Sequence, residues 1–565
     1  MTFDIHELPW SVCGSYLAVS SLEGFADSEN LYIRSVHTKE RWMSLYRISL
    51  WKGDRELTYR ERAYPGLLAL ETGEGESALF TFQNEDALRI RAENCQVRLT
   101  MENPADYRFV CAAENGKYEL NTYSYKMLFS ALAGGIDVTA PWEEIRNKQV
   151  VLRINTQEKG TAEAVLEEYE SVWDEKEYEG TLEEKAAEWE EKFSAFLKGC
   201  PKTPEKYKEC REKAAYLNWS CIVHPVGYLK RNAMFMSKNW MTYVWSWDHC
   251  FNAMALAKGH PQTAWEQMIL PFDLQDASGA LPDCVGDQDI IRNFVKPPIH
   301  GLVLMWMEEN TEILTEQRVA ELYPCLCRWT EYWFYYHDQD RDGVPEYRHG
   351  NDSGWDNSTI FADGPAVEGT DLCAFLILQM EMLGRMAEKL GMSEEARIWE
   401  QRSSRLLQTM MEHFFRAGEL LSCESGTHKV SDGKSLQNFL ILVLGERLPE
   451  EVRKPLLEKL LQESGYRTKW GFATERTDSR YYRSDGYWRG PIWAPAAWLI
   501  VQGLKACGYK KEALQVMTDF CDLCRRSGFA ENFDAVTGEP LRDRAYTWTA
   551  SVFLLFANAI WEEEQ

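Results

Sequence analysis

The sequence predicts a two-domain protein: an N-terminal antiparallel β-sandwich at 1–160, a helical linker at 161–204 and an all-α (α/α)6 barrel at 205–565. Three observations predict this fold. Apolar residues recur with a period of two in the first part and with a helical period in the last. The segment between them is rich in Glu, Lys and Ala. Beyond residue 205, long and short connections alternate between the predicted helices.

Short strands separated by turn residues fill the first part. Ala87–Arg91 and Gln96–Met101 alternate apolar and polar side chains, which is typical of strands with one buried face. Asn115-Gly116 lies between two further strand-like segments and is a strong hairpin signal. Many short strands joined by turns favour a β-sandwich.

Twelve segments of helical period follow the linker. They are 205–223, 248–258, 261–275, 297–311, 316–336, 369–391, 393–415, 435–446, 449–464, 489–507, 509–527 and 546–562. Six long loops alternate with short turns between them, and alternate connections of an up-and-down array emerge at the same end. We therefore expect all six long loops on one face. An open helical array would show the same alternation, and we favour a closed barrel because the loops converge on one chemistry.

Charge and composition narrow the expected partners. The 565 residues include 62 Lys and Arg against 88 Asp and Glu, a net charge of −26. This field repels phosphate backbones and anionic lipids, so we expect neither nucleic acid nor a membrane as partner. No apolar run could span a bilayer, and the first residues lack a signal-peptide pattern. Fifteen scattered cysteines then indicate reduced thiols in a cytoplasmic protein.

The long loops gather aromatic rings beside carboxylates, amides and cations. They carry Trp245, Trp247 and Asp248 in the first loop, Lys296 in the second, Trp355 in the third, and Tyr487, Trp488 and Arg489 in the fifth, with Trp493 one turn into the next helix. A pyranose offers C–H groups to an aromatic face and hydroxyls to paired polar groups, so this set suits a small carbohydrate substrate. Tryptophans near helix starts also serve as plain core packing, which is the alternative interpretation.

Two acids in these loops are candidates for glycoside hydrolysis, which needs one carboxyl group to protonate the leaving oxygen and another to activate water or attack the sugar. Asp356 lies in the third loop and Glu531 in the sixth. Packing against an indole and crowding by other acids both raise a carboxyl pKa, as a proton donor requires. Asp356 could instead cap a turn, and Asp534 could take the place of Glu531.

Four strings in the second half resemble glycoside hydrolase family 63, which belongs to the same structural clan as the trehalases of family 37. They are VWSWDHCFNA at 244–253, DSGWDNST at 352–359, SDGYWRGPIWAP at 484–495 and AENFDAVTGEPL at 530–541. The resemblance implies an (α/α)6 barrel behind a β-sandwich and inverting hydrolysis of an α-linked sugar, usually glucose and sometimes mannose. It implies Asp356 as general acid and Glu531 as general base. The residues implied to line the sugar pocket are Trp245, Asp248, Trp355, Trp488, Arg489 and Trp493. The chain lacks the membrane anchor of the eukaryotic processing glucosidases, which removes the glycoprotein-trimming role.

An acidic segment after the fifth helix is a candidate calcium loop. Asp338, Asp340, Asp342 and Glu346 occupy positions 1, 3, 5 and 9 of an EF-hand-like pattern, and Val344 would add its carbonyl at position 7. Position 12 is His rather than Glu, and a plain polar turn is the alternative. The chemistry itself needs no cofactor, so a calcium ion here would be structural.

The preferred interpretation is an inverting, exo-acting α-glycosidase acting on a small oligosaccharide or a glucosylated metabolite. A trehalase or a mannosyl- or glucosylglycerate hydrolase is the nearest alternative, and Lys296, Arg292 and Arg489 could meet the carboxylate of a glycerate. An epimerase or isomerase would want two histidines as acid and base, and only His249 and His300 fall beside the loop face. A sugar-binding protein without catalysis would keep the tryptophans but need not keep both acids.

Overall fold

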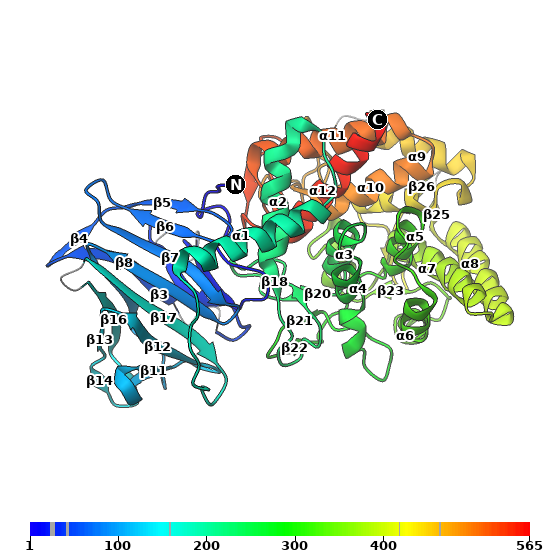
Figure 1. The fold of residues 1–565 in the computed structure, drawn as a ribbon. Helices are drawn as coiled ribbons and strands as arrows, with labels where there is room; N and C mark the ends of the chain where they lie inside the picture. Colours follow the sequence, from blue (N-terminus) through cyan, green and yellow to red (C-terminus); the bar gives the residue numbers. More distant parts are fainter. Residues whose placement is uncertain (23–28, 41–44, 157–159, 417–418, 463–464) are drawn as a thin grey trace.

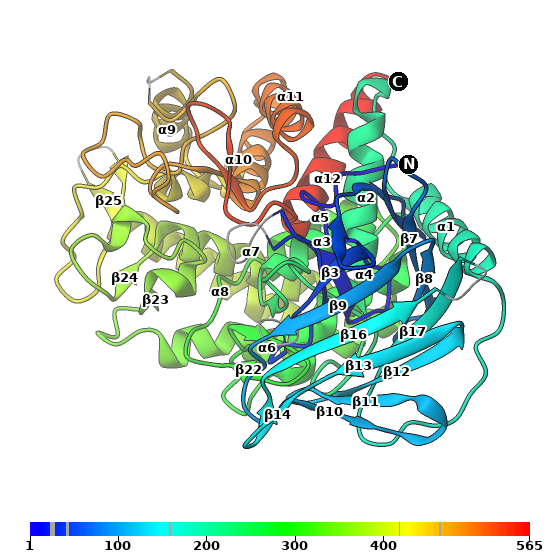
Figure 2. The same cartoon turned by 90° about the vertical axis from the view of Figure 1, so that its left-hand side faces the viewer.

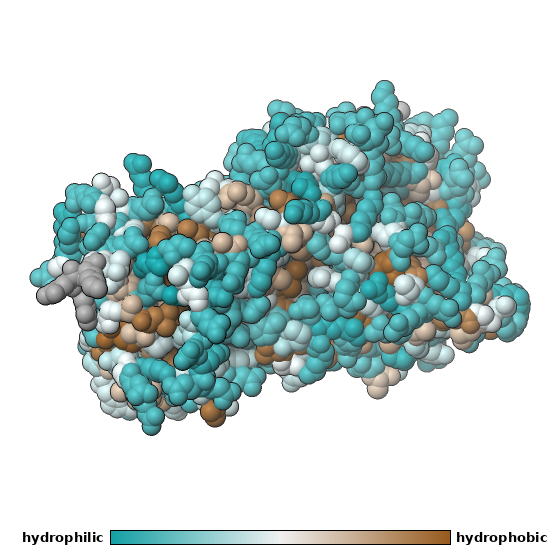
Figure 3. Space-filling model, in the orientation of Figure 1, coloured by the Kyte–Doolittle hydropathy of each residue, from teal (hydrophilic) through white to brown (hydrophobic). Residues whose placement is uncertain are grey.

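The computed structural model describes residues 1–22, 29–40, 45–156, 160–416, 419–462 and 465–565. Figure 1 shows blue and cyan sheets on one side and green to red helices on the other. The predicted order of a β-sandwich followed by an all-α barrel is confirmed. The face drawn in Figure 3 is mostly hydrophilic, with apolar residues in small patches. Within the described ranges no helix has the length and apolar character that crossing a membrane would need.

Two antiparallel sheets form the N-terminal domain (Figure 2). The first consists of β1 (Leu17–Ser20), β2 (Tyr32–Ser35), β3 (Leu45–Lys52), β4 (Arg55–Leu57), β9 (Gln96–Glu102), β16 (Gln149–Asn155) and β13 (Gly135–Thr139). The second consists of β10 (Phe109–Ala112), β11 (Tyr118–Asn121), β12 (Lys126–Ala133), β17 (Thr161–Tyr169), β8 (Ala87–Glu93), β7 (Ser77–Asn84), β6 (Leu68–Glu71) and β5 (Arg60–Ala63). Their buried faces supply Phe80 and Ile90 from one sheet and Leu99 and Leu152 from the other, as the period of two predicts.

The predicted hairpin is confirmed, because β10 pairs with β11 across Asn115-Gly116. Both residues have positive φ, a conformation that Asn and Gly adopt at low cost. The predicted linker at 161–204 is wrong in its first part. Residues 161–169 form β17, a central strand whose alternating pattern continues the sandwich, and only α1 (Leu182–Gly199) is helical. A capping box between Thr181 and Glu184 fixes the start of α1.

Six buried helical segments form a closed inner ring in the described part of the chain. They are α3 (Asp248–Leu256), α5 (His300–Asn310), α7 (Thr370–Lys389), η6 (Leu436–Arg447), α10 (Ala494–Ala506) and α12 (Thr547–Glu563). Each packs against the next, and α12 packs against α3. The closed ring excludes the open array and makes the domain a barrel. Five of the segments are apolar on nearly all sides, as helices buried in a large core are.

The outer layer consists of α2 (Lys208–Cys221), α4 (Pro261–Ile269), α6 (Glu316–Tyr336), α8 (Ser393–Phe414), α9 (Glu450–Gln462) and α11 (Lys510–Ser527). Some predicted helices differ from the structure. The one at 261–275 is α-helical only to Ile269 and continues as a 3-10 helix over Leu270–Leu274. The segment at 435–446 is a 3-10 helix interrupted at Gly445, whose backbone lies so close to Ala506 that no Cβ would fit. The helix predicted from 489 begins at Ala494, and Trp493 belongs to a short strand before it rather than to the helix.

Small antiparallel sheets tie the six long loops together in pairs. β20 (Val244–Trp245) pairs with β21 (Cys284–Val285) and β22 (Ile290–Ile291). β23 (Glu346–Tyr347), β24 (Val367–Glu368) and β27 (Cys423–Glu424) form the second sheet, and β28 (Ile492–Trp493), β29 (Asn532–Phe533) and β30 (Pro540–Leu541) form the third. The remaining short strands are β14 (Trp142–Glu143), β15 (Arg146–Asn147), β18 (Ile222–Val223), β19 (Ala233–Met234), β25 (Phe415–Arg416) and β26 (Glu419–Leu420). The loops therefore meet at the end of the barrel where the inner helices begin.

Buried polar contacts join the two domains. The Lys238 ammonium group donates hydrogen bonds to Ser11 and Ser15, and the Tyr216 hydroxyl lies 3.0 Å from the Ser11 amide. The Asp287 carboxylate of the second loop lies 2.7 Å from the His37 ring. The sandwich therefore contacts the second long loop of the barrel directly.

Candidate active site

The DSGWD segment folds as a tight turn that presents Asp356. The Asp352 carboxylate accepts hydrogen bonds from the backbone of Val295, Arg348 and His349, which fixes η4 (Gly350–Ser353). Gly354 follows with φ of 72°, and a Cβ there would meet the Trp247 ring at 2.5 Å. This close approach explains the glycine and directs the chain so that Asp356 remains partly exposed.

Two stacked tryptophans connect Asp356 to the segment that carries Glu531. The Trp488 indole donates a hydrogen bond to Asp356 Oδ2 at 3.1 Å. Its ring stacks on Trp493 at 3.9 Å with an interplanar angle of 8°. Trp493 in turn pairs with Asn532, the residue after Glu531, between β28 and β29. Two acids 175 positions apart in sequence therefore belong to one cluster, as expected of loops on the same face.

The acids of this cluster influence each other's protonation. Burial raises the pKa of Glu531 to about 8; the Asp543 charge adds to the shift, Arg542 opposes it, and Asp248 and Asp356 add smaller effects. Burial likewise raises the pKa of Asp248 to about 8, against the charge of Lys296. The pKa of Asp356 is raised by burial, while Lys296 and the Trp488 hydrogen bond lower it. The site thus holds protons near neutral pH, as acid–base chemistry requires.

A buried ion pair lies beside these carboxyl groups. Lys296 Nζ lies 2.9 Å from Asp283 Oδ1, with both side chains less than a tenth exposed, and it also donates to the Asn351 carbonyl. The Lys296 charge lowers the pKa of both Asp248 and Asp356. Lys296 therefore opposes protonation of both carboxyl groups.

Residues 241–549, more than half of the chain, match the family model of the mannosylglycerate hydrolase MGH1-like glycoside hydrolase domain. The chain belongs to the MGH1-like glycoside hydrolases. The resemblance to glycoside hydrolase family 63 is thereby confirmed.

Among the relatives of this hydrolase, the mannosylglycerate hydrolase of Rubrobacter radiotolerans is 23% identical over 401 residues, which cover 55% of this chain and 89% of the relative. The glucosylglycerate hydrolase of Mycolicibacterium hassiacum is 21% identical over 407 residues, covering 55% and 91%. The family 63 mannosylglycerate hydrolase of Thermus thermophilus, solved with glucose, matches in structure with a TM-score of 0.53 at 20% identity, over 61% of this chain and 99% of that one. A bacterial glucoamylase solved with acarbose matches 99% of this chain and 94% of its own, with a TM-score of 0.63 at 10% identity. The two structural matches show the fold, and the second includes the β-sandwich.

The predicted sugar-binding residues of this hydrolase fall into two groups. Trp245, Tyr487 and Arg489 keep part of their surface open to solvent. The others are buried behind the acids, with no more than 4% of their surface exposed, and they are Trp247, Asp248, Lys296, Trp355, Trp488 and Trp493. The buried tryptophans pack on one another, Trp355 lying 4.8 Å and Trp247 6.3 Å from the Trp488 ring. In this structure they form the wall that positions the acids, and the exposed group is what a sugar could contact.

Sequence reasoning missed several groups that complete the cluster. Asp543 accepts hydrogen bonds from Asn239 and the Ala545 amide, and its backbone carbonyl accepts one from the Glu531 amide at 2.7 Å. The Tyr546 hydroxyl lies 3.4 Å from Asp248 Oδ1, and the Trp548 indole donates to the Glu531 carbonyl. All three precede or begin α12. The rule that inner helices begin at the loop face could have found them, since it places 543–548 there.

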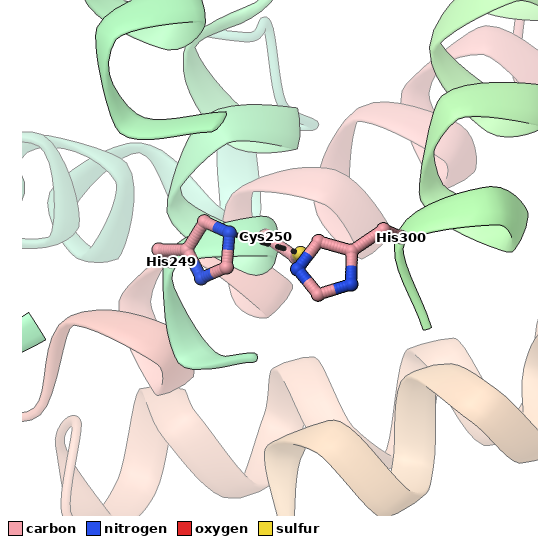
Figure 4. Close-up of side chains that lie close together, drawn as sticks. All are labelled: His249, Cys250 and His300. Atoms are coloured by element: carbon pink, nitrogen blue, oxygen red, sulfur yellow. Dashed lines mark hydrogen bonds between the residues drawn. The ribbon is translucent and has the colours of Figure 1, made fainter. Parts of the chain in front are cut away.

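His249 and His300, the pair considered for an epimerase, are fully buried in the barrel core (Figure 4). Their rings lie 5.3 Å apart, with Cys250 beside them. Burial lowers the pKa of His249 to about 4, and burial also lowers the pKa of His300 well below its usual value. Neutral, inaccessible imidazoles cannot exchange protons with a sugar, which argues against this alternative.

The acidic segment at 338–346 brings only some of its predicted ligands together. The carboxyl groups of Asp338, Asp340 and Asp342 lie within 4.8 Å of one another. The Asp342 carboxylate accepts a hydrogen bond from the Val344 amide, which closes the turn. Glu346 lies in β23, buried, and its Oε1 has no hydrogen-bond partner in the described structure. Calcium binding here stays a prediction.

Replacing Trp488 with Phe is expected to raise the pKa of Asp356 further, because the hydrogen bond that lowers it is lost, while retaining most of the ring stacking. A hydrogen bond to a charged group is worth about 1.5–3 kcal/mol. Because Asp356 is partly exposed, a water molecule can replace part of that stabilisation in the variant. If Asp356 is the acid, the descending limb of the kcat/KM profile moves to higher pH. Movement of the ascending limb instead would assign Asp356 the role of base.

Proposed function

We propose that this hydrolase removes the terminal sugar of a small α-glycoside, with inversion, using Asp356 as general acid and Glu531 as general base. One observation carries the proposal: two carboxyl groups with raised pKa values lie near enough for the charge of Asp356 to raise the pKa of Glu531, one partly open to solvent and one buried. The family match supports glycoside hydrolysis. The roles of the two acids follow the matching motifs.

In the proposed reaction Asp356 gives its proton to the glycosidic oxygen as the bond to the anomeric carbon breaks. Glu531 removes a proton from a water molecule that attacks the same carbon from the opposite face. The net result is addition of water, and proton exchange with solvent restores the starting forms. The productive state therefore has the proton on Asp356 and the charge on Glu531. Because the pKa of Glu531 is about 8 in the free site, its charged form becomes more populated as the pH rises toward 8.

We further propose that the substrate is a hexosylglycerate, the class that the relatives' names indicate. Such a substrate carries a carboxylate, and a cation must receive it. Lys296 already pairs with Asp283, and Arg542 pairs with Asp485 at 2.5 Å. Arg489 has no carboxylate partner among the described residues; its Nε donates to the Asn357 carbonyl next to Asp356. Its position supports a role in binding the glycerate.

Replacing Arg489 with Gln is expected to lower kcat/KM for a hexosylglycerate by about 10–100-fold, since a hydrogen bond to a charged group is worth about 1.5–3 kcal/mol. The loss should appear mainly in KM. Turnover of an uncharged aryl α-glycoside by the same variant should change much less. Arg397→Gln, which alters an exposed arginine of the outer helix α8 paired with Glu394, is the matched control. Equal losses on both substrates would mean that Arg489 only positions Asp356.

The test of the proposed function is hydrolysis of a panel containing α-mannosylglycerate, α-glucosylglycerate, trehalose and neutral α-glucosides, with the product followed by NMR. We expect the β-anomer to appear first from a hexosylglycerate. First appearance of the α-anomer would overturn the inverting mechanism. Preferred turnover of a neutral glucoside would overturn the glycerate assignment and leave the glycosidase intact.

A further inference from the structure

A second cluster of ionisable groups lies away from Asp356 and Glu531, in the loops around β23, β24 and β27. It consists of Asp342 after α6, Glu368 in β24, His413 in the last turn of α8 and His428 after β27. One ligand atom from each residue lies within 4.8 Å of the other three. Four segments far apart in sequence thus converge on one point.

The separations within the cluster resemble those between ligands of one metal ion. His413 Nδ1 lies 3.2 Å from Asp342 Oδ2. His428 Nε2 lies 3.6 Å from Asp342 Oδ2 and 3.9 Å from Glu368 Oε1. Two ligands in tetrahedral contact with a zinc-sized ion lie about 3.3 Å apart, since each bond is about 2.0–2.1 Å long. The imidazoles and carboxylates are therefore close to the spacing that shared coordination needs.

Glu368 provides an independent indication that this cluster binds a cation. Its side chain is fully buried, and Oε2 lies 2.6 Å from His413 Nε2. Its Oε1 lies inside the cluster and has no hydrogen-bond partner among the described residues. A buried carboxylate oxygen without a partner is energetically unfavourable, because it has lost its hydration without gaining a hydrogen bond. A cation would remove this cost.

Glu368 contacts His413 in the way that carboxylates often contact a metal-binding histidine, through the ring nitrogen that does not bind the metal. Metal-binding imidazoles commonly donate their second ring N–H to a carboxylate, which fixes the ring and its tautomer. Here Glu368 Oε2 occupies that position on Nε2, leaving Nδ1 of His413 directed toward Asp342. Asp338 and Asp340 add further negative charge nearby, and Asp340 Oδ2 lies 3.2 Å from His428 Nε2.

We propose that Asp342, Glu368, His413 and His428 bind one divalent transition-metal ion of the zinc, cobalt or nickel type. Two imidazoles favour these ions, whereas calcium takes oxygen ligands. The acidic segment thus supplies Asp342 to a site completed by residues far along the chain, rather than by Val344 and Glu346. The ion would join α8 and the 419–434 loop to β24, and so brace the loop that carries Asp356. The proposal does not depend on the proposed function.

The test uses the full-length chain, stripped with a chelator and titrated with Zn²⁺, Co²⁺ or Ca²⁺. We expect one equivalent of Zn²⁺ to bind by calorimetry, the melting temperature to rise by roughly a few degrees, and Co²⁺ to give a visible absorption band of imidazole coordination. A hundredfold excess of Ca²⁺ should not displace Co²⁺. Absence of the band in the wild-type protein, or displacement by Ca²⁺, would overturn the proposal, and these readouts need no variant and no substrate.

Variants identify the ligands. His413→Gln and His428→Gln should each abolish the cobalt band and weaken Zn²⁺ binding at least tenfold. The matched control is His260→Gln, which alters a half-buried histidine bonded to the Phe196 carbonyl at the far side of the barrel domain. Unchanged Zn²⁺ affinity in both site variants would overturn the assignment. If either variant fails to fold, Asp342→Asn, at an exposed position, provides the same comparison.

Discussion

Replacing Asp356 with Asn, or Glu531 with Gln, is expected to lower kcat/KM for a hexosylglycerate by about 10²–10⁴-fold. Each amide preserves the shape of the side chain but can neither donate nor accept the required proton. Both carboxyl groups have raised pKa values in one cluster, which also contains the buried Asp248. Steady-state kinetics of the two variants measure the loss, and wild-type turnover in either one would remove that residue from the chemistry.

The two variants should differ in a way that identifies the roles. A fluoride leaving group needs no proton, so an α-glycosyl fluoride should restore much of the activity of the acid variant. It should do little for the base variant, in which water is still not activated. The predicted pattern is rescue of Asp356→Asn and not of Glu531→Gln. The reverse pattern would exchange the two assignments.

Asp534→Asn is the control for the sixth loop, since Asp534 was the other acid considered there. Its Oδ1 accepts hydrogen bonds from the Val536 and Thr537 amides, both at 2.8 Å. The structure therefore gives Asp534 a turn-capping role, and an asparagine can retain it. We expect near wild-type turnover. A loss as large as that of Glu531→Gln would reopen the choice between the two acids.

The sequence allowed the helices and their alternation to be predicted because periodicity depends on local residues. The predicted range 316–336 coincides with α6, where the apolar spacing and the Thr315 cap are both local signals. The prediction of a helical linker was wrong at 161–169 because Glu and Ala dominate the composition there, although apolar and polar residues alternate as in a strand. Pairing with β8 and β12 overrides helix propensity there.

The candidate site could be predicted in part for the same reason. Asp356 and Glu531 stand within recognisable motifs at the loop face. The burial of Trp355, Trp488 and Trp493 could not be read from the sequence, because a wall tryptophan and a sugar platform have the same residue type. Glu368, His413 and His428 were missed because each joins Asp342 only through the packing of separate loops. The spacing of residues within one segment cannot show which separate loops come together in the fold.

Glu531→Gln is also expected to change stability in a pH-dependent way, by a few kcal/mol at most. Burial raises the pKa of Glu531 from 4.5 to about 8, so the folded chain binds this proton more tightly than the unfolded chain. The stabilisation is complete below pH 4.5, where both forms are protonated, and it is lost as the pH rises to about 8. Each unit of difference corresponds to about 1.36 kcal/mol.

Glutamine carries no such proton and therefore lacks this slope. The variant and the wild type should have similar melting temperatures near pH 4.5, and the variant should be more stable by several degrees at pH 8. Thermal unfolding across this range measures the difference. Glu539→Gln, at an exposed acid of the same loop paired with Arg526, should follow the wild type throughout.

Parallel curves for Glu531→Gln and the wild type would mean that Glu531 is already ionised in the folded protein. Glu531 could then act as a base across this pH range, and any rise of kcat/KM with pH would have to come from the titration of another group. A divergence between pH 5 and 8 would instead show that the hydrolase gives up stability to keep this carboxyl group buried beside Asp543 and Asp248, where it can be poised for proton transfer.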